Sequence, residues 1–324
     1  MTQGSRPFKT SSVTCGVTAA LCAAGVLTVT AQQPIFRGLG DAVRVFVTVT
    51  DGDGRLVTTL SKEDFEIRDE GKPQPITLFD NTPQPVRLVV MLDVSGSMVG
   101  NLPLLRGATA QLVERLGAKD LVRIGNFGHE ITISPTFTRN AGELRAAMPN
   151  DIAPDAPTPL WRAVDQALEA LGGESDEARP VVLVLSDGKD SGPISFRQKN
   201  VSQSEVIDRA RREDVMVFGI GMRSRGAQRP PGIGPGGLQA ALMADLTDPG
   251  LALVAQHTGG GYREIRFGQD LAEAFAQVVD ELHSQYLIGF APPKRDGKVH
   301  DLDVRLAKKG MKTRARRSYV APKS

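Results

Sequence analysis

Cysteine is almost absent from this sequence. The chain has 324 residues and only two cysteines, Cys15 and Cys22, both close to its start. We expect residues 1–31 to be removed on export, which leaves a mature chain without cysteine. That absence excludes disulfides, thiol catalysis and thiolate metal sites.

The expectation of export comes from the first segment. Arg6 and Lys9 precede a mildly apolar stretch from Val13 to Thr30, which ends in small residues before Gln32. This pattern is typical of a cleaved signal peptide. An uncleaved anchor is the alternative, but the stretch lacks the roughly 20 strongly apolar residues that a membrane span needs. We therefore expect an exported protein, periplasmic or extracellular, with no membrane span after cleavage.

An excess of charge is also absent. The formal net charge is +2, and removal of Arg6 and Lys9 with the signal peptide brings it to zero. A neutral exported protein gives no general reason to expect nucleic-acid partners. With 40% hydrophobic and 23% charged residues, the composition is that of a folded protein. The length allows one large or two medium domains.

The usual catalytic motifs are missing. Neither Ser95, Ser97 nor Ser186 lies in a Gly-x-Ser-x-Gly sequence, and no Gly-Lys-Ser/Thr phosphate loop occurs. A phosphoryl-transfer aspartate site needs a second carboxylate where Ser95 stands. The histidines are scattered and form no His-Glu-x-x-His motif: His129, His257, His283 and His300. We predict that the protein is not an enzyme.

Two apolar runs end in aspartates. The run from Leu88 to Leu92 has no alternation, which is typical of a strand buried on both faces of a parallel sheet, and it stops at Asp93. The run 181–185 ends in Ser186-Asp187-Gly188. Because the carboxyl ends of parallel strands meet at one edge of a sheet, we expect both carboxylates at a shared site.

Further oxygen ligands lie near these aspartates. Ser95 and Ser97 follow Asp93 at alternate positions, and Thr158 opens a predicted helix after a Pro-flanked loop. Such hard oxygen donors suit Mg²⁺, Mn²⁺ or Ca²⁺ better than zinc. Taken one by one, the same residues are also explained as helix or turn caps, with Thr158 the N-cap and Pro159 the first helical residue.

The strand and helix patterns predict two structural parts. Strands and helices alternate over residues 86–284, which predicts a doubly wound, mostly parallel sheet flanked by helices. Residues 32–85 and 285–324 have β patterns, and neither flank alone makes a convincing core. We predict that the flanks pair into one small β-sandwich, with the α/β domain inserted between its strands. The basic tail is predicted as an ordinary exposed strand face, with one strand from Thr313 to Val320; contact with an anionic surface or nucleic acid is the alternative. Its basic residues are Lys308, Lys309, Lys312, Arg314, Arg316 and Arg317.

These motifs carry a family resemblance. Asp93-Val94-Ser95-Gly96-Ser97 matches the Asp-x-Ser-x-Ser motif of the von Willebrand factor type A domain. Thr158 and Asp187 match the other two metal-site positions of that family. The resemblance covers residues 86–284, and the β flanks, with the sequence at 286–290 after the last helix, look like a bacterial exported subfamily.

The resemblance implies a metal-ion-dependent adhesion site. Ser95 and Ser97 are then direct ligands, Thr158 binds directly or through water, and Asp93 and Asp187 commonly act through water. With few anionic ligands the cation stays electron-poor, so an acidic side chain of a protein partner can complete its coordination. The implied function is an exported adhesion-type binding module that uses Mg²⁺, or Mn²⁺ or Ca²⁺. A metal-independent scaffold and a metal-dependent hydrolase are the alternatives.

Overall fold

The computed structural model describes residues 42–172, 178–186, 190–192, 200–223, 249–266 and 271–323. Residues 41–324 belong to one compact unit. Two predictions lie outside the described residues, namely the signal peptide at 1–31 and the position of Asp187. In the described part, every helix is too short or too polar to cross a membrane.

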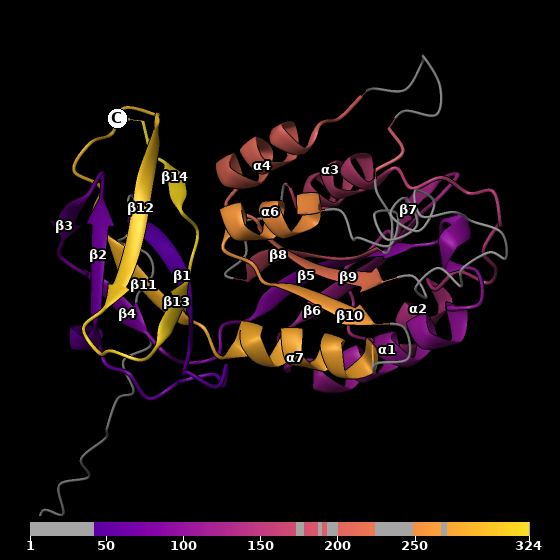
Figure 1. Cartoon of the computed structure of the whole chain (residues 1–324), viewed down its shortest axis with the longest axis horizontal. Coiled ribbons are helices and arrows are strands. Elements are labelled where there is room, and N and C mark those ends of the chain that lie inside the picture. The colour runs from indigo at the N-terminus through magenta and orange to yellow at the C-terminus, as the bar shows by residue number, and fades with distance from the viewer. Residues whose placement is uncertain are drawn as a thin grey trace, which may run out of the picture. The chain divides into compact units, whose positions relative to one another are not determined.

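The centre of the chain is a six-stranded sheet (Figure 1). All neighbouring strands are parallel, except that β7 runs antiparallel to β6 at one edge. This arrangement confirms the predicted fold class. In spatial order the strands are β10 (Tyr262–Arg266), β9 (Met216–Arg223), β8 (Arg179–Ser186), β5 (Val86–Asp93), β6 (Leu121–Phe127) and β7 (Ile131–Ile133).

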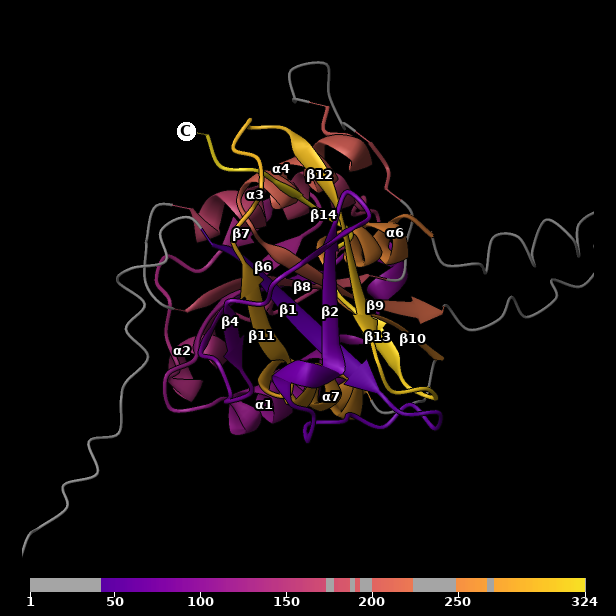
Figure 2. The same ribbon diagram turned by 90° about the vertical axis from the view of Figure 1, so that its left-hand side faces the viewer.

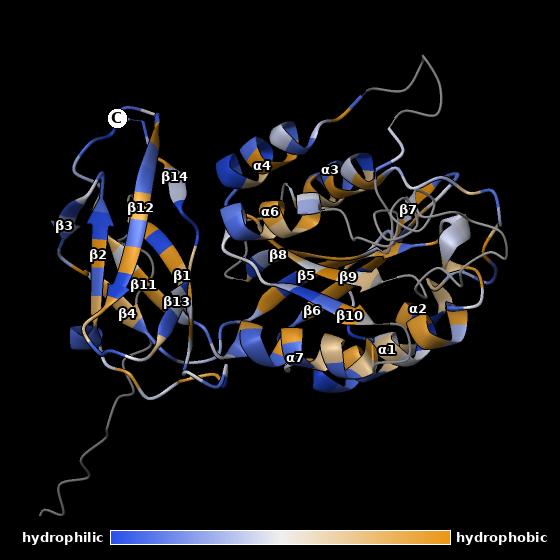
Figure 3. Ribbon diagram, in the orientation of Figure 1, coloured by the Kyte–Doolittle hydropathy of each residue, from blue (hydrophilic) through white to orange (hydrophobic). Residues whose placement is uncertain are grey.

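Helices cover both faces of this sheet. One face packs on α1 (Leu102–Arg115), α2 (Ala141–Ala146) and α7 (Leu271–His283). The other packs on α3 (Leu160–Leu171), α4 (Gln203–Arg212) and α6 (Pro249–Thr258). Each helix turns its apolar side to the sheet, and Figure 3 shows the hydrophilic outer side of α4.

The position of strand β5 in the sheet explains why its sequence does not alternate between apolar and polar residues. Leu88 and Val90 point to the α1 side, whereas Val89 and Met91 point to the α3 side, and all four are fully buried. Each such side chain contributes about 1.5–3 kcal/mol of hydrophobic stabilisation. Burial on both faces fixes β5 in the middle of the sheet and thereby fixes the position of Asp93 at its end.

The two flanks combine into a pair of antiparallel sheets (Figure 2). Each sheet contains strands from both ends of the chain, so neither flank forms a sheet alone. Val45, Val47, Ile67 and Tyr286 are fully buried between them. One sheet has the order β13 (Lys312–Arg314), β1 (Val43–Thr50), β11 (Tyr286–Phe290) and β4 (Leu78–Asp80), and the other β14 (Ser318–Val320), β12 (Val299–Leu306), β2 (Phe65–Asp69) and β3 (Lys72–Gln74).

One predicted strand is in fact two. The sequence pattern indicates a single strand from Thr313 to Val320, but Thr313 pairs with Val49 in one sheet and Tyr319 pairs with His300 in the other. The two sheets lie on opposite sides of the sandwich core, so one straight strand cannot join both. The chain therefore crosses between the sheets at 315–317.

A buried histidine lies in the second sheet of the sandwich. His300 is 4% exposed, and its Nδ1 is 3.0 Å from Asp69 Oδ1, while its Nε2 is 3.2 Å from Asp296 Oδ1. The Tyr319 hydroxyl donates to the same Asp69 oxygen at 2.9 Å. Desolvation lowers the pKa of His300, but the two carboxylates, Asp69 first, outweigh it and leave the pKa above its usual value.

This cluster gives a prediction for the pH dependence of stability. Because the folded pKa of His300 is raised, protonated His300 stabilises the fold fully below its unfolded pKa of about 6.5. That contribution is lost as the pH rises through the folded pKa. We expect His300→Gln to lower the free energy of unfolding more at pH 6 than at pH 9, as measured by urea denaturation. An equal loss at both pH values would show that His300 is not charged in the folded state.

Candidate functional site

Asp93 is the buried end of the central strand. Its side chain is fully buried. Oδ1 accepts a hydrogen bond from the backbone N–H of Ser95 at 2.8 Å, and Oδ2 accepts from the Ser186 hydroxyl at 2.5 Å. A carboxylate withdrawn from water needs donors or a cation to offset the lost hydration. The Ser186 bond joins the ends of β5 and β8, as expected from their parallel pairing.

The two serines of the motif lie together. Ser95 is buried, whereas Ser97 is exposed in the 3-10 helix Gly96–Met98. Their hydroxyl oxygens are 2.9 Å apart. A pair of neighbouring hydroxyl oxygens beside a buried carboxylate is a suitable donor set for a hard divalent cation.

A second loop packs against this motif at Gly96. The Gly96 N–H donates to the carbonyl oxygen of Ala156 at 2.9 Å. A Cβ atom at Gly96 would lie only 1.9 Å from the carbonyl oxygen of Pro154. Only glycine therefore allows the motif and the loop that leads to Thr158 to approach this closely. This contact brings Thr158 to the same end of the sheet as Ser95.

The predicted cap role of Thr158 is wrong by one position. The N-cap of α3 is Pro159 and the helix begins at Leu160, whose N–H donates to the Thr158 carbonyl oxygen at 2.8 Å. Thr158 is 8% exposed. Ser191 holds its backbone from both sides, because the Ser191 hydroxyl accepts from Thr158 N at 3.1 Å and Ser191 N donates to Thr158 O at 2.9 Å.

Asp190 supplies the helix cap instead. Its Oδ1 accepts from the Trp161 N–H in the first turn of α3 at 3.2 Å, and its Oδ2 accepts from Gly192 N at 3.0 Å. The partner comes from a loop 29 residues away in sequence. Local sequence patterns detect caps that are adjacent in sequence, so they could not reveal this one.

Asp187 lies outside the described residues. Strand β8 is described to Ser186, and the chain is described again at Asp190. Ser186 contacts Asp93, and Ser191 contacts Thr158. The residues on both sides of Asp187 therefore contact the predicted site.

A histidine–aspartate pair occurs nearby, and sequence reasoning missed it. His129 Nε2, on the turn between β6 and β7, is 3.2 Å from Asp155 Oδ1 in the loop that packs on Gly96. Both side chains are exposed. The contact with His129 is the largest cause of a lowered pKa at Asp155. In the described part of the chain, no three His, Cys, Asp or Glu side chains gather as a metal site.

Comparison with known proteins gives a family match for the central part of the chain. Residues 88–232 match the family model of the von Willebrand factor type A domain. No curated protein matches the chain.

Among the solved structures, protein BatB from Bacteroides thetaiotaomicron has 16% identity and a TM-score of 0.44, over 61% of this chain and 98% of its own. A von Willebrand factor type A protein from Catenulispora acidiphila has 12% identity and a TM-score of 0.46, over 86% of this chain and 73% of its own. The pilus adhesin SpaC from Lactobacillus rhamnosus GG has 12% identity and a TM-score of 0.42, over 80% of this chain and 42% of its own. From the family match and the helix-flanked sheet that ends in Asp93, we conclude that this chain carries a von Willebrand factor type A domain.

Proposed function

We propose that the domain binds a divalent cation, Mg²⁺ or else Mn²⁺ or Ca²⁺, at the carboxyl end of β5. The ligands are oxygens of Asp93, Ser95, Ser97, Thr158 and Asp187. The observation that carries this proposal is the convergence of three loops. In the Asp93–Ser97 motif, Asp93 accepts a hydrogen bond from Ser186 at the end of β8, and Gly96 donates one to Ala156 in the loop before α3. Ser191, in the loop after β8, bonds the backbone of Thr158.

The donor set favours a cation that needs one more ligand. Both oxygens of Asp93 already accept hydrogen bonds, which suits contact with the cation through water. The Ser95 and Ser97 hydroxyl oxygens would be uncharged metal ligands. A cation held mainly by neutral oxygens keeps much of its charge and attracts a further carboxylate. We infer that this carboxylate is an acidic side chain of a protein partner.

The surface beside the motif supports contact with a protein. Ser97 is exposed, and Val99, two residues on, is 51% exposed. Leu104 on α1 is 40% exposed. Exposed apolar side chains around a polar centre are a common feature of protein-binding surfaces. The protein is proposed to work outside the cytoplasm, after removal of residues 1–31.

A binding role is proposed in preference to a catalytic one. A hydrolase that used the same cation would need a general base at the site. His129, which is exposed and lies 3.2 Å from Asp155, is the base that the hydrolase alternative would use. Metal-dependent hydrolysis of generic ester or phosphate substrates, abolished by Asp93→Ala, would favour the hydrolase.

Calorimetric titration tests the metal site. Ser97→Ala removes one proposed ligand at an exposed position, so we expect Mn²⁺ and Mg²⁺ to bind about tenfold or more weakly than to the metal-stripped wild type. Stability should change by less than about 0.5 kcal/mol, because the position is on the surface.

The chain contains a matched control for this substitution. Ser204 is also exposed, and its hydroxyl is 3.0 Å from that of Ser202, just as Ser97 pairs with Ser95. Ser204→Ala should bind metal like the wild type. If Ser97→Ala also binds both ions like the wild type, the serine pair is not a ligand set. That result would favour the alternative function, a scaffold that binds its partners without a metal ion.

A further inference from the structure

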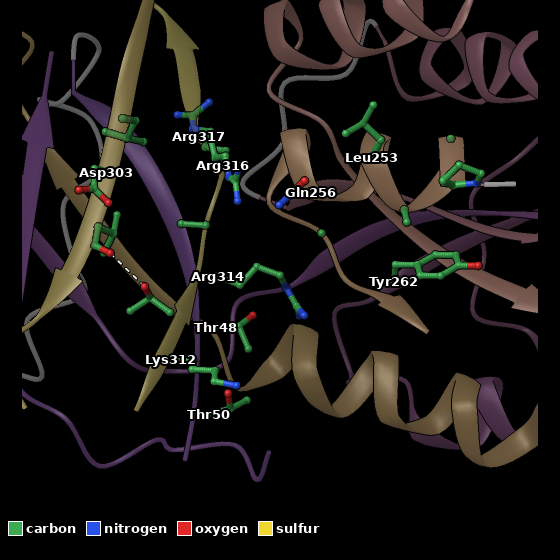
Figure 4. A pocket seen from close by; sticks show the side chains of 18 of the residues that line it. Thr48, Thr50, Leu253, Gln256, Tyr262, Asp303, Lys312, Arg314, Arg316 and Arg317 are labelled. Carbon is green, nitrogen blue, oxygen red and sulfur yellow. Dashed lines mark hydrogen bonds between the residues drawn. The ribbon is translucent and has the colours of Figure 1, made fainter. Parts of the chain in front are cut away.

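A groove of about 920 Å³ lies between the sandwich and the α/β part of the chain (Figure 4). Strands β12 and β13 line one side, and α6 and β10 line the other. The groove reaches the edge of the central sheet where β9 starts. Gly260 lines the groove and packs on the start of β9, since a Cβ there would lie 1.9 Å from the Val217 carbonyl oxygen. Asp93 lies at the opposite, carboxyl edge of the sheet.

The lining of this groove is strongly cationic. It contains one carboxylate, Asp303, and four cationic side chains, namely Lys312, Arg314, Arg316 and Arg317. Arg314 is paired with Glu281, and Arg316 with Asp214. Lys312 and Arg317 are exposed and form no ion pair with a described residue. These two charges therefore remain available to a ligand.

Two basic groups in or near the groove have lowered pKa values. Burial is the main cause of the lowered pKa of His257 on α6, and Arg211 and Arg317 lower it further. Burial also lowers the pKa of Arg314 to about 10, with a further contribution from Arg263 on β10. Burial is thus the larger cause in both groups. The preference for an anionic ligand rests on the lining itself, in which Lys312 and Arg317 are exposed cations and Asp303 is the one carboxylate.

The walls also suit an extended polypeptide. Both β13 and β10 are edge strands of their sheets, so each has one side that pairs with no described strand. Edge strands can pair with an added strand from another chain. Leu253, which is 42% exposed, and Tyr262 provide apolar surface in the same groove. A peptide with alternating acidic and apolar side chains matches these features.

We propose that this groove binds an extended, acidic segment of a protein partner, independently of the metal site. The mixed lining favours a peptide over a nucleic acid. Tyr262 is the one aromatic side chain in the groove lining as described, whereas single-stranded nucleic acids are held by several stacking aromatics. Carboxylates of the segment would pair with Lys312 and Arg317, and its apolar side chains would contact Leu253.

Fluorescence polarisation tests this proposal with a fluorescein-labelled peptide of five Asp-Val repeats. The titration is done in EDTA, which separates its result from that of the metal site. We expect saturable binding at low ionic strength that weakens as salt increases. The double variant Lys312→Glu/Arg317→Glu should bind the peptide about tenfold more weakly, because it reverses two charges in the groove.

Lys294→Glu/Lys309→Glu is the matched control, since both lysines are exposed and lie outside the groove lining. It makes the same change in net charge and should bind like the wild type. Thermal unfolding checks that all variants are folded. Three results would each overturn the proposal: no saturable binding at millimolar peptide, equal weakening in the control, or tighter binding of a 20-nucleotide single-stranded DNA than of the peptide.

Discussion

Gly96→Ala is expected to abolish measurable divalent-cation binding and to lower the free energy of unfolding by about 1–3 kcal/mol. The added Cβ would lie 1.9 Å from the Pro154 carbonyl oxygen and 2.7 Å from the carbonyl carbon. These are backbone atoms, which cannot avoid the clash by rotating a side chain. The loop must move as a whole, and Thr158 moves with it. One methyl group thereby separates two parts of the proposed site.

Gly107→Ala is the control for this substitution. Gly107 lies in α1, and a Cβ there would meet nothing within 4 Å. Alanine in an exposed helix interior is favoured over glycine, so this variant should be more stable by about 0.5–1 kcal/mol and should bind Mn²⁺ normally. Urea denaturation and calorimetry measure both effects. If Gly96→Ala behaves like Gly107→Ala, the two loops do not pack as described.

Much of the fold could be predicted because the signals are local. The unbroken apolar run of β5 indicates burial on both faces, and the structure shows neighbours on both sides of it. The alternation in β1, with Val43, Val45 and Val47 buried, indicates a sheet with one buried face. The division of 313–320 between two sheets could not be predicted, because the pattern of side chains does not say which partner strand each half will meet.

The site was predicted in part. Asp93, Ser95 and Ser97 are found together, since their spacing along one loop already fixes their proximity. The position of Thr158 relative to them depends on Gly96. The capping of α3 that was predicted for Thr158 is provided by Asp190 from a distant loop. Contacts of this kind depend on which loops the fold brings together. That the five residues of the site are metal ligands remains a prediction, which the titration tests.

The basic tail shows the same limit. Alternation with apolar residues predicts an ordinary exposed strand face for the six basic residues between Lys308 and Arg317. In the structure, α6 and β10 lie opposite part of that face, so four of these cations line a groove, namely Lys312, Arg314, Arg316 and Arg317. The sequence pattern gives the orientation of side chains relative to their own strand. It does not show which other element faces them.

The junction between α7 and the sandwich gives the second large effect. Glu281 is 3% exposed, accepts from the Thr48 hydroxyl at 3.0 Å and is paired with Arg314. Gln285 Nε2 donates to the Thr48 hydroxyl oxygen at 2.7 Å, and Gln285 also accepts from the buried Arg179. The network connects helix α7 with β1, β8 and β13. Loss of one member leaves buried polar groups without partners.

Glu281→Ala is therefore expected to lower the free energy of unfolding by about 2–4 kcal/mol, the lower part of the range reflecting the partial exposure of Arg314. Glu273→Ala, on the exposed side of the same helix, should change it by less than about 0.5 kcal/mol. A double-mutant cycle with Arg314→Met, followed by urea denaturation, isolates the pair. We expect a coupling of about 0.5–3 kcal/mol. Strict additivity would mean that the ion pair does not stabilise the junction, and that the packing of apolar side chains alone holds α7 against the sandwich.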